Sequence, residues 1–589
     1  MPVIRRIALR HFRGFENFGT RLPGHALLVG EPGAGRSDLI EGIVRVLDGD
    51  YWRSRRADEL DFYDLDTSQP AEVEVVVGGL SIPAQDALIH QLEFWVGKTG
   101  TLISELEDAS LMDRATHEPV VRLTYRLEIG EDGRLDETVF WPKLSPAGKD
   151  PRLVRMTDRA YLPFLWQRGG SARTIDLTGR SEFRELIDVQ TGEPFEDAIK
   201  KFLAEVTAAA GAFSEQERVA AALDELLEGI LPVRRFDPSK TAAETLRFLP
   251  DGGATSGLLR SLAAALTLRQ GPALLPAARH GSSANAALRG GLILAGARRL
   301  PGAIVAVDEL SADLDPALAG YLARQLHSSA GQLLMSAHSS GVAQAFEVDE
   351  IVRLHWRDGK RQVALGRRPT SHEDRIAQRY FAWQILPALS ASAIVVVEGQ
   401  HDRLALDALV QKTTGLGVPS LDAAAIEIVE SNGTGESSKV AEQSHALGIY
   451  TIVLFDNDDA KGAAVPGYVG TALANADVVL RLPPRTAIEK VLVSGVPDAE
   501  LVRVLGQLLN AIPGLVLPTG WETRTGKDLQ RIAIDMLHGE KGALHAAFVR
   551  EIEPTQVGQL ALDLLARLHE LGTIQAKTGV VGLDDDATT

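Results

Sequence analysis

Two stretches past the middle of the chain each join an apolar run, rich in β-branched residues, to carboxylates. Residues 393–397 and 450–455 form the apolar runs, and acidic residues follow both of them. Short continuous apolar runs of this kind predict strands buried in a parallel sheet. Ligands gather beyond the carboxyl ends of such strands, and carboxylates there favour hard divalent cations. The acidic residues at these two positions are Glu398, Asp402, Asp456 and Asp458.

The bulk composition limits the class of protein. The chain has 589 residues, too many for one hydrophobic core, so we expect about two to four domains. It has no cysteine, and no apolar run reaches the roughly 18–20 residues of a membrane span. The first residues alternate and carry arginines, which is typical of a strand and not of a signal peptide. We therefore expect a cytoplasmic protein without disulfides or thiolate zinc sites.

A glycine-rich loop at residues 30–37 lies between an expected strand and an expected helix. In this context backbone N–H groups can wrap a polyphosphate, and the helix N-terminus adds its positive dipole end. Ser37 would contact Mg²⁺, whereas Arg36 replaces the usual lysine with a planar guanidinium, which puts rapid hydrolysis in doubt. An ordinary glycine-rich turn is the alternative. The loop glycines are Gly30, Gly33 and Gly35.

Further stretches complete the pattern of an ATPase. An expected strand at 303–307 ends in Asp308, which would order Mg²⁺, and Glu309, which would polarise the attacking water. An expected strand at 333–337 ends in His338, which is placed like the switch histidine of ABC-type ATPases. Two other motifs of that class are expected, the D-loop at residues 311–315 and a degenerate signature motif at residues 255–257.

The remaining features of the N-terminal half concern its binding to nucleotide, to a second copy of the chain and to DNA. Arg13 resembles the arginine that follows the first strand and reaches the nucleotide in SMC/RecF-like ATPases. Residues 195–232 are helical by period and would either form a dimer contact or pack on their own sheet. The basic cluster at 52–56 could meet DNA phosphates, but such clusters are more often solvated faces. The net charge of −18 argues against unspecific coating of nucleic acid.

The second half follows a strand–helix–strand–helix–strand order between residues 393 and 455. That order predicts a parallel sheet whose neighbouring strand ends carry the carboxylates. A strand ending in Glu-Gly, with an acid three residues after the glycine, and a later strand ending in Asp-x-Asp resemble the Toprim fold of topoisomerases, primases and some nucleases. His401 lies between these acids and is better read as an ordinary structural histidine.

An SMC/RecF-like ATPase followed directly by Toprim resembles the OLD (overcoming lysogenization defect) family of endonucleases. Residues 7–15 and 61–67 resemble the nuclease subunit of Gabija-type antiphage systems. The resemblance implies an α/β fold, with an ABC/SMC–RecF-like ATPase, a Rossmann-like Toprim sheet and C-terminal helices. The expected ranges are 1–375 for the ATPase, with a helical insertion at about 165–250, 376–390 for a linker helix, 391–500 for Toprim and 501–589 for the helical region.

The resemblance also implies an activity: a nucleotide-regulated DNA endonuclease that hydrolyses phosphodiesters with two Mg²⁺ or Mn²⁺ ions about 3.5 to 4 Å apart. The four strand-end acids would bind the ions, and Glu398 would double as general base. Glu489 matches a later family acid of the metal shell. Lys541 matches the family lysine that stabilises the transition state, with Lys527 as the alternative.

The implied partners are duplex DNA, a second or further copies of the chain in a homodimer or homotetramer, and a helicase-type protein. ATP with Mg²⁺ would occupy the ATPase half and gate cleavage. The alternative function is a RecF-like DNA-repair ATPase or clamp loader whose Toprim module is inert. The intact set of strand-end carboxylates favours the endonuclease.

Overall fold

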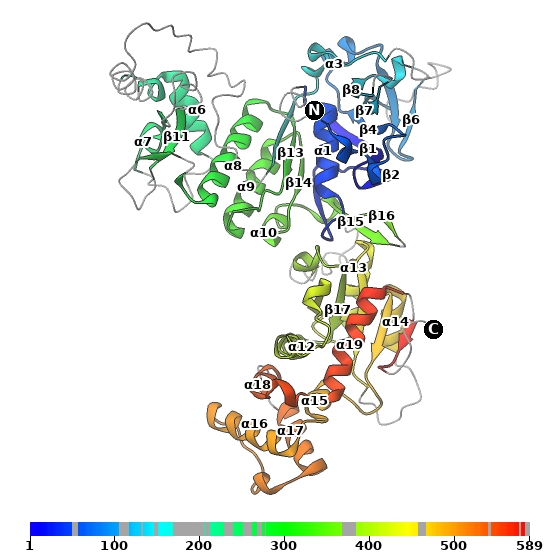
Figure 1. Cartoon of the computed structure of the whole chain (residues 1–589), viewed down its shortest axis with the longest axis vertical. Coiled ribbons are helices and arrows are strands. Elements are labelled where there is room, and N and C mark those ends of the chain that lie inside the picture. The colour runs from blue at the N-terminus through cyan, green and yellow to red at the C-terminus, as the bar shows by residue number, and fades with distance from the viewer. Residues whose placement is uncertain are drawn as a thin grey trace. The chain divides into compact units, whose positions relative to one another are not determined.

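The chain divides into two compact units, drawn in Figure 1. The first comprises Met1–Leu28 and Gly35–Val352, and the second comprises Val29–Ala34 and Arg353–Thr589. The computed structural model describes residues 1–49, 57–104, 117–130, 133–145, 151–168, 205, 212–228, 239–250, 262–267, 274–276, 279–357, 359–367, 385–457, 467–539, 544–576 and 579–583.

An antiparallel sheet forms the first layer of the first unit. Its order is β2-β1-β4-β7-β5-β6, with β8 on β7. The alternating sequence of β4 explains the layer, because Val73 and Val75 are buried while Glu72 pairs with Arg126 of β7. The strands are β1 (Val3–Phe12), β2 (Phe15–Arg21), β4 (Ala71–Gly78), β5 (Leu92–Val96), β6 (Thr101–Ile103), β7 (His117–Ile129) and β8 (Leu135–Phe140).

A second sheet carries the predicted ATPase motifs, in the order β16-β15-β3-β14-β13-β9. Its four strands β3, β14, β13 and β9 run parallel, as the buried apolar runs predict. The strands are β3 (Ala26–Gly30), β9 (Phe164–Arg168), β13 (Ile304–Asp308), β14 (Gln332–Ser336), β15 (Ile351–Arg357) and β16 (Lys360–Leu365). The helices around these two sheets are α1 (Arg36–Leu47), α3 (Ile82–Ala87), α4 (Met156–Arg159), α8 (Ser282–Arg299), α9 (Pro316–Ser329) and α10 (Ser340–Ala343).

The range expected to hold a helical insertion contains strands as well. Strand β9 begins at its N-terminal border and joins the ATPase sheet beside β13. Further along lie α6 (Glu217–Glu228), α7 (Ala242–Thr245) and a small sheet of β10 (Leu246–Pro250), β11 (Leu262–Leu266) and β12 (Leu275–Pro276). The basic cluster at 52–56, the signature stretch at 255–257 and most of 195–211 lie outside the described residues.

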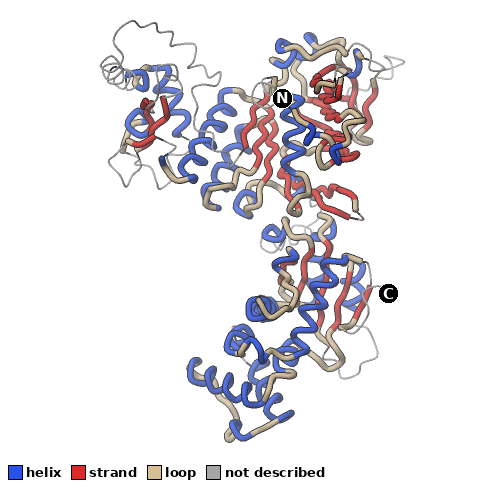
Figure 2. Tube along the Cα trace, in the orientation of Figure 1, coloured by secondary structure: helices blue, strands red, loops and turns tan. Residues whose placement is uncertain are grey.

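The second unit contains a five-stranded parallel sheet in the order β18-β17-β19-β20-β21, which confirms the α/β prediction. In Figure 2 its red strands run side by side among blue helices. The strands are β17 (Ala393–Val397), β18 (Ile426–Glu430), β19 (Tyr450–Phe455), β20 (Val478–Arg481) and β21 (Gly579–Val581). The helices are α12 (Gln400–Thr413), α13 (Ser437–Ala446), α14 (Gly467–Asn475), α15 (Ile488–Val493), α16 (Asp498–Ala511), α17 (Gly526–Gly539), α18 (Leu544–Glu551) and α19 (Gln559–Ile574).

Short 3-10 turns connect these elements. They are η1 (Glu59–Asp61), η2 (Tyr63–Leu65), η4 (Pro142–Leu144), η9 (Val348–Glu350), η11 (Leu386–Ala388), η12 (Asp422–Ala424), η13 (Thr434–Glu436), η14 (Trp521–Thr523) and η15 (Pro554–Gln556). Most of the predicted linker helix, residues 376–384, lies outside the described part of the chain, and the described end of that range is the turn η11.

Arg353 of β15 is a fully buried arginine within the second unit. Its guanidinium donates to backbone carbonyls that lie just before β17 and β19, and it contacts Glu31 of the glycine-rich loop at 3.4 Å. Burial lowers the pKa of Arg353 to about 10, so it stays charged at neutral pH. The carbonyl acceptors are Ala391 (2.7 Å), Gly448 (2.9 Å), Leu389 (3.2 Å) and Leu447 (3.3 Å).

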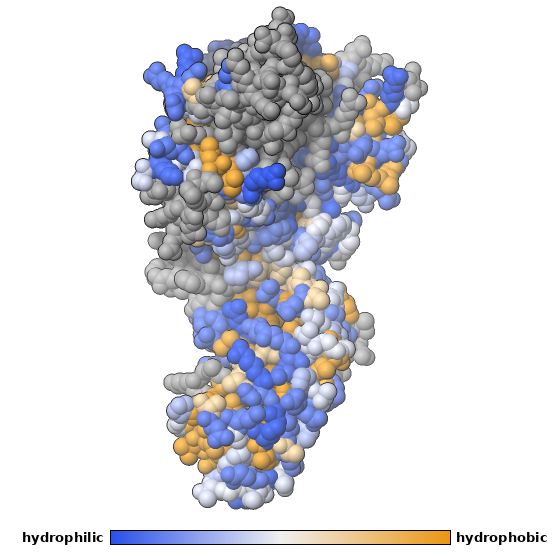
Figure 3. Space-filling view, turned by 60° about the vertical axis from the view of Figure 1, so that its left-hand side comes forward, coloured by the Kyte–Doolittle hydropathy of each residue, from blue (hydrophilic) through white to orange (hydrophobic). Residues whose placement is uncertain are grey.

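The surface is mixed. On the face shown in Figure 3, apolar residues form small groups among hydrophilic ones. The most exposed large apolar side chains include Val516, Met1 and Ile82. None of the helices in the part of the chain that the structure describes has the length and apolar character needed to cross a membrane.

Candidate functional site

Four predicted acids meet at one edge of the sheet in the second unit. Glu398 directly follows β17, and Asp456 directly follows β19, the parallel neighbour of β17. Asp402 lies in the first turn of α12, where its carboxylate accepts the N–H of Gly399 at 3.1 Å. Glu489 lies in the first turn of α15. Each acid therefore sits at a strand end or a helix start that faces the same edge.

The acids act on one another electrostatically. Burial and nearby negative charges raise the pKa of Asp456 to about 8, although the N–H of Ile488 opposes this. Burial likewise raises the pKa of Asp402 to about 6, against the opposing N–H of Gly399. The charges that raise the pKa of Asp456 belong to Asp402, Glu489 and Glu398. The structure therefore brings these four predicted residues together.

This crowding fits a cation-binding site. Carboxylate oxygens are the donors that Mg²⁺ and Mn²⁺ prefer, and a bound cation relieves the repulsion that raises these pKa values. Asp458 and Lys541 were predicted to belong here and lie outside the described residues. Lys527, the alternative to Lys541, is exposed in the first turn of α17.

Hydrogen bonds from backbone N–H groups and one serine hydroxyl hold the two strand ends in place. The N–H of Gly433 donates to the carbonyl of Glu398 at 2.7 Å, and the buried hydroxyl of Ser431 donates to the carbonyl of Val397 at 2.9 Å. After β19, Asn457 and Thr486 exchange two backbone hydrogen bonds of 2.9 and 3.1 Å. The sequence alone does not show that Ser431 and Gly433, which follow β18, support the end of β17.

Among the described residues, the group whose potential ligand atoms lie within metal-binding distance of one another is not among the four acids. Of the described residues, His25, His327 and Glu350 place potential ligand atoms within 4.8 Å of one another. The N–H of Leu333, however, donates to Nδ1 of His25 at 3.0 Å. Burial and the neighbouring His327 lower the pKa of His25, so the ring is neutral and carries its proton on Nε2. Neither nitrogen then has a lone pair for a cation, and this group is structural.

The glycine-rich loop has the backbone of a phosphate-binding loop. Gly30, Gly33 and Gly35 all have positive φ, at 138°, 76° and 95°. At Gly30 a Cβ would lie 1.9 Å from the carbonyl oxygen of Leu354, so only glycine fits there. Helix α1 begins directly after Gly35, at Arg36.

The remaining ATPase residues lie together in the first unit. The hydroxyl of Ser37 donates to Asp308 at 3.0 Å, and the hydroxyl of Ser336 donates to the same oxygen at 2.6 Å. Glu309 follows with a φ of 58°, a left-handed conformation that costs a non-glycine residue about 1–3 kcal/mol and is typical of functional sites. Its N–H donates to the Ser336 hydroxyl at 2.8 Å. Ser37 and Asp308, each predicted to contact Mg²⁺, therefore lie within hydrogen-bond distance of each other.

Arg36 contacts His338, the residue at the switch-histidine position. Its two terminal nitrogens lie 3.1 and 2.8 Å from the ring nitrogens of His338, and Nε2 of His338 lies 3.2 Å from a carboxylate oxygen of Glu309. Burial lowers the pKa of Arg36, while the charges of Glu309 and Asp308 oppose this. Arg36, which stands where a lysine is usual, thus contacts His338, a residue of a separate sequence motif.

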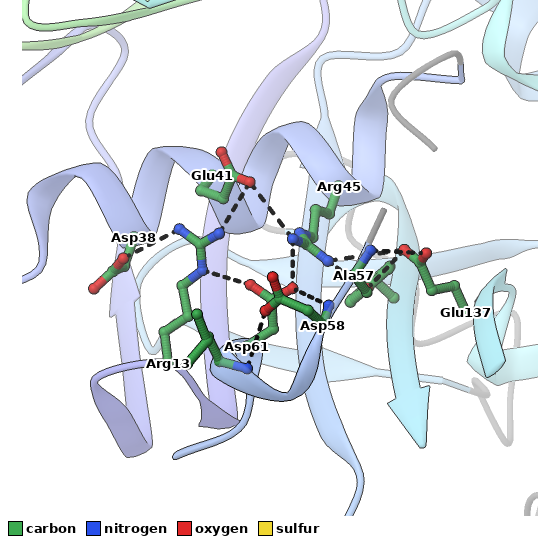
Figure 4. Close-up of polar contacts among 10 residues, drawn as sticks. Arg13, Asp38, Glu41, Arg45, Ala57, Asp58, Asp61 and Glu137 are labelled. Carbon is green, nitrogen blue, oxygen red and sulfur yellow. Dashed lines mark hydrogen bonds and ion pairs between the residues drawn. The ribbon is translucent and has the colours of Figure 1, made fainter. Parts of the chain in front are cut away.

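Arg13 belongs to an acidic network, drawn in Figure 4. Its guanidinium contacts Asp61 at 2.8 Å, Glu41 at 3.2 Å and Asp38 at 3.3 Å. The buried Arg45 also contacts Asp61, at 2.7 Å. A cavity of about 440 Å³, lined in part by these side chains, lies beside them. Arg13 was expected at the nucleotide, whereas the partners that the structure gives it are three carboxylates.

Part of the second unit matches a known family model. Residues 389–458 match the family model described as "Overcoming lysogenization defect protein-like, TOPRIM domain". The second unit carries an OLD-like Toprim domain. The matched residues include three of the four acids that meet at the sheet edge. With the ATPase motifs upstream, the domain order is that of an OLD-family ATPase–Toprim protein, as the sequence predicted.

Two curated relatives are similar to a larger part of the chain. They are the DNA replication and repair proteins RecF of Brucella abortus (strain 2308) and Brucella melitensis biotype 1. Each is 28% identical over 387 residues, which is 59% of this chain and 92% of the relative. This similarity agrees with the predicted RecF-like ATPase.

Solved SMC heads are more distant. An Smc head bound to the C-winged helix domain of ScpA is 15% identical with a TM-score of 0.36, covering 63% of this chain and 99% of that chain. The SMC head domain from Thermotoga maritima is 11% identical with a TM-score of 0.28, covering 62% and 99%. TM-scores this low do not by themselves establish a common fold.

Proposed function

We propose that this protein is a divalent-metal-dependent DNA endonuclease whose activity is regulated by nucleotide bound to its ATPase half. The observation that carries the proposal is the group of acids at the Toprim sheet edge, where Asp456 has a pKa of about 8 because it is buried beside other carboxylates. The OLD-like Toprim match over the same strands supports it.

The chemistry divides among the chain's own residues. A pair of Mg²⁺ or Mn²⁺ ions, when bound, would polarise the phosphodiester and offset the charge of the leaving 3′ oxygen. Asp402, Asp456 and Glu489, with Asp458, would hold the ions through oxygen donors. Glu398 would withdraw the proton of the attacking water, and Lys541 would offset negative charge in the transition state.

We propose that ATP gates this reaction rather than powering it. Arg36 is the cation of the phosphate loop, and here it contacts both ring nitrogens of His338. A triphosphate would compete for the guanidinium and so release His338 and Glu309, while the planar guanidinium remains a poor substitute for lysine in hydrolysis. Cleavage of DNA is therefore expected to respond equally to ATP and to a non-hydrolysable analogue.

The test is nicking of supercoiled plasmid in Mg²⁺ or Mn²⁺, with ATP, with a non-hydrolysable analogue and without nucleotide. Glu398→Ala is expected to abolish cleavage, and Glu522→Ala, an exposed acid of η14, serves as the matched control. Undiminished cleavage by Glu398→Ala would show that another site or a contaminant does the work. Strict dependence on hydrolysable ATP would reject gating.

The similarity to RecF favours one alternative, a DNA-repair ATPase or clamp loader with an inert Toprim module. It predicts nucleotide-dependent DNA binding without cleavage in any divalent metal. The same plasmid assay, combined with a gel-shift on duplex DNA, separates the two functions.

The cellular role we propose is antiphage defence of the Gabija type, with a homodimer or homotetramer and a helicase-type partner. The resemblance of residues 7–15 and 61–67 supports it. Phage plating on cells that express the chain with and without a helicase-like neighbour tests the role, and light scattering of the purified chain tests the assembly.

A further inference from the structure

Two histidines from different helices lie beside the acidic site. His545 is in the first turn of α18 and is only 3% exposed. His401 is in the first turn of α12, next to Asp402. Their rings are nearly parallel, at 11°, with centroids 5.7 Å apart. The stack therefore joins the helix that presents Asp402 to a helix more than a hundred residues further along the chain.

The nearest polar partner of His545 is a carboxylate of the site. Its Nε2 lies 3.4 Å from Oε1 of Glu489, at the long end of hydrogen-bond distance. Apart from this contact, neither ring nitrogen of His545 has a hydrogen-bond partner among the described residues. A buried N–H without a partner costs about 1–3 kcal/mol, which favours a shorter contact with Glu489.

The pKa of Glu489 is shifted in the opposite direction to the pKa values of Asp402 and Asp456. Burial would raise the pKa of Glu489, but the hydrogen bond of His545, the N–H of Glu489 itself and the charges of His545 and His538 together outweigh burial and lower it. The pKa values of Asp402 and Asp456 are raised in the same surroundings. The buried imidazole of His545 reaches Oε1 of Glu489, and the exposed His538 also approaches this oxygen, with its Nδ1 at 3.6 Å.

We propose that His545 is a positioning residue: its Nε2–H donates to Oε1 of Glu489 and turns the other oxygen toward the bound cation. The stacked ring of His401 fixes the plane of the His545 ring. A hydrogen-bonded partner of this kind restricts the rotation of a ligating carboxylate, and its loss typically weakens metal binding about 10- to 100-fold. The inference rests on the proposed function, because it takes Glu489 as a cation ligand.

The experiment is calorimetric titration of the full-length protein with Mn²⁺ alone, which needs no DNA cleavage. His545→Leu removes the donor and is expected to weaken Mn²⁺ binding about 10-fold or more. His545→Gln keeps an N–H near the position of Nε2 and is expected to restore affinity close to the wild-type value. His401→Leu should give a smaller loss of the same sign. His569→Leu on α19 is the matched control.

The titration is paired with plasmid nicking over a range of Mn²⁺ concentrations. Here His545→Leu is expected to raise the Mn²⁺ concentration for half-maximal cleavage while the rate at saturating Mn²⁺ changes little. A role in folding alone would lower the Tm without moving that concentration. Melting curves in EDTA establish that each variant is folded, and His545→Gln carries the test if His545→Leu is not.

Two outcomes would reject the positioning role of His545, and one would reject the proposed metal site. Unchanged Mn²⁺ affinity in His545→Leu, with weakened affinity in Glu489→Gln, rejects positioning by His545 and leaves the endonuclease intact. Equal losses in folded His545→Gln and His545→Leu reject the donor role. Unchanged affinity in Glu489→Gln shows that Glu489 is not a ligand, so the proposed metal site itself is wrong.

Discussion

The two parallel sheets of this chain both deliver acids to their strand ends, and they surround those acids differently. In the ATPase sheet, Asp308 accepts two serine hydroxyls, and Glu309 contacts His338. In the Toprim sheet, Asp402 and Asp456 are buried beside other carboxylates, and their pKa values rise to about 6 and about 8.

The two sites therefore differ in what balances the carboxylate charge, which is protein donors in one sheet and the proposed cation in the other. Acids that protein donors satisfy contribute to the stability of the fold, whereas acids that face one another cost free energy until a cation joins them. A site that destabilises its own fold persists because its ligand compensates, which is common at functional sites. The contrast predicts opposite responses when an acid in each sheet loses its charge.

The largest expected effect comes from Asp456→Asn. Loss of a cation ligand should reduce DNA cleavage at least about 10³-fold. In EDTA at pH 8 the same variant should melt at a higher temperature than the wild type, because the amide removes a buried negative charge that other acids repel. Plasmid nicking and calorimetric melting measure the two effects on one sample.

Asp308→Asn is the matched variant in the other sheet. It keeps the shape of the side chain but loses a charge that two hydroxyls donate to and that lies near Arg36, so its Tm should fall. If both variants shifted Tm in the same direction, the contrast between the two sheets would be wrong.

These strand ends could be predicted from the sequence for a local reason. A buried strand of a parallel sheet is a short apolar run, and the acids directly follow it, so Glu398, Asp308 and Asp456 are visible without any long-range information. The βαβ order of the elements then places neighbouring strand ends together. The Toprim match at 389–458 confirms that part of the fold prediction.

What the sequence did not reveal depends on distant partners. Strand β21 (residues 579–581) completes the Toprim sheet beside β20, about a hundred residues earlier, and such pairing leaves no periodic signal. His545 and Arg353 are single polar residues in apolar surroundings, and only the folded chain shows that one reaches Glu489 and the other four carbonyls. The roles of Asp458 and Lys541 remain predictions.

Glu31 represents a third arrangement, in which the acid pairs with a buried arginine, Arg353. Arg353→Met should lower the free energy of unfolding by about 3–5 kcal/mol, because it leaves buried carbonyls unpaired and removes the partner of Glu31. Equilibrium unfolding in urea measures the loss.

Arg531→Met is its surface control. Arg531 is 82% exposed and pairs only loosely with Asp535, at 3.8 Å, so its loss should cost less than about 0.5 kcal/mol. A loss of that small size for Arg353→Met would mean that water replaces the guanidinium at the carbonyls.

The stability of the fold should also depend on pH through Asp456. The folded pKa of Asp456, about 8, lies above the ordinary value near 3.9, so the folded state binds more protons between these values. In EDTA, the contribution of this group to stability should therefore fall as pH rises from about 5 to 8, by roughly 3–4 kcal/mol.

Melting curves across this pH range check the prediction. Asp456→Asn should flatten the slope, and saturating Mn²⁺ should reverse it, because the cation binds the deprotonated acids. An identical slope in wild type and Asp456→Asn would place the pH dependence elsewhere in the chain.

The smallest expected effect concerns the satisfied site. Arg36→Lys replaces a planar group that touches both ring nitrogens of His338 with a single ammonium, which can touch only one of them. His338 and Glu309 are then freer to act on a bound nucleotide, and ATP turnover should rise about three- to tenfold.

Phosphate release by the purified chain measures ATP turnover, with Arg324→Lys, at an exposed arginine of α9, as the control. Turnover that stays at the wild-type level would show that the contact between Arg36 and His338 does not limit hydrolysis, and the satisfied character of this site would then have no bearing on its activity.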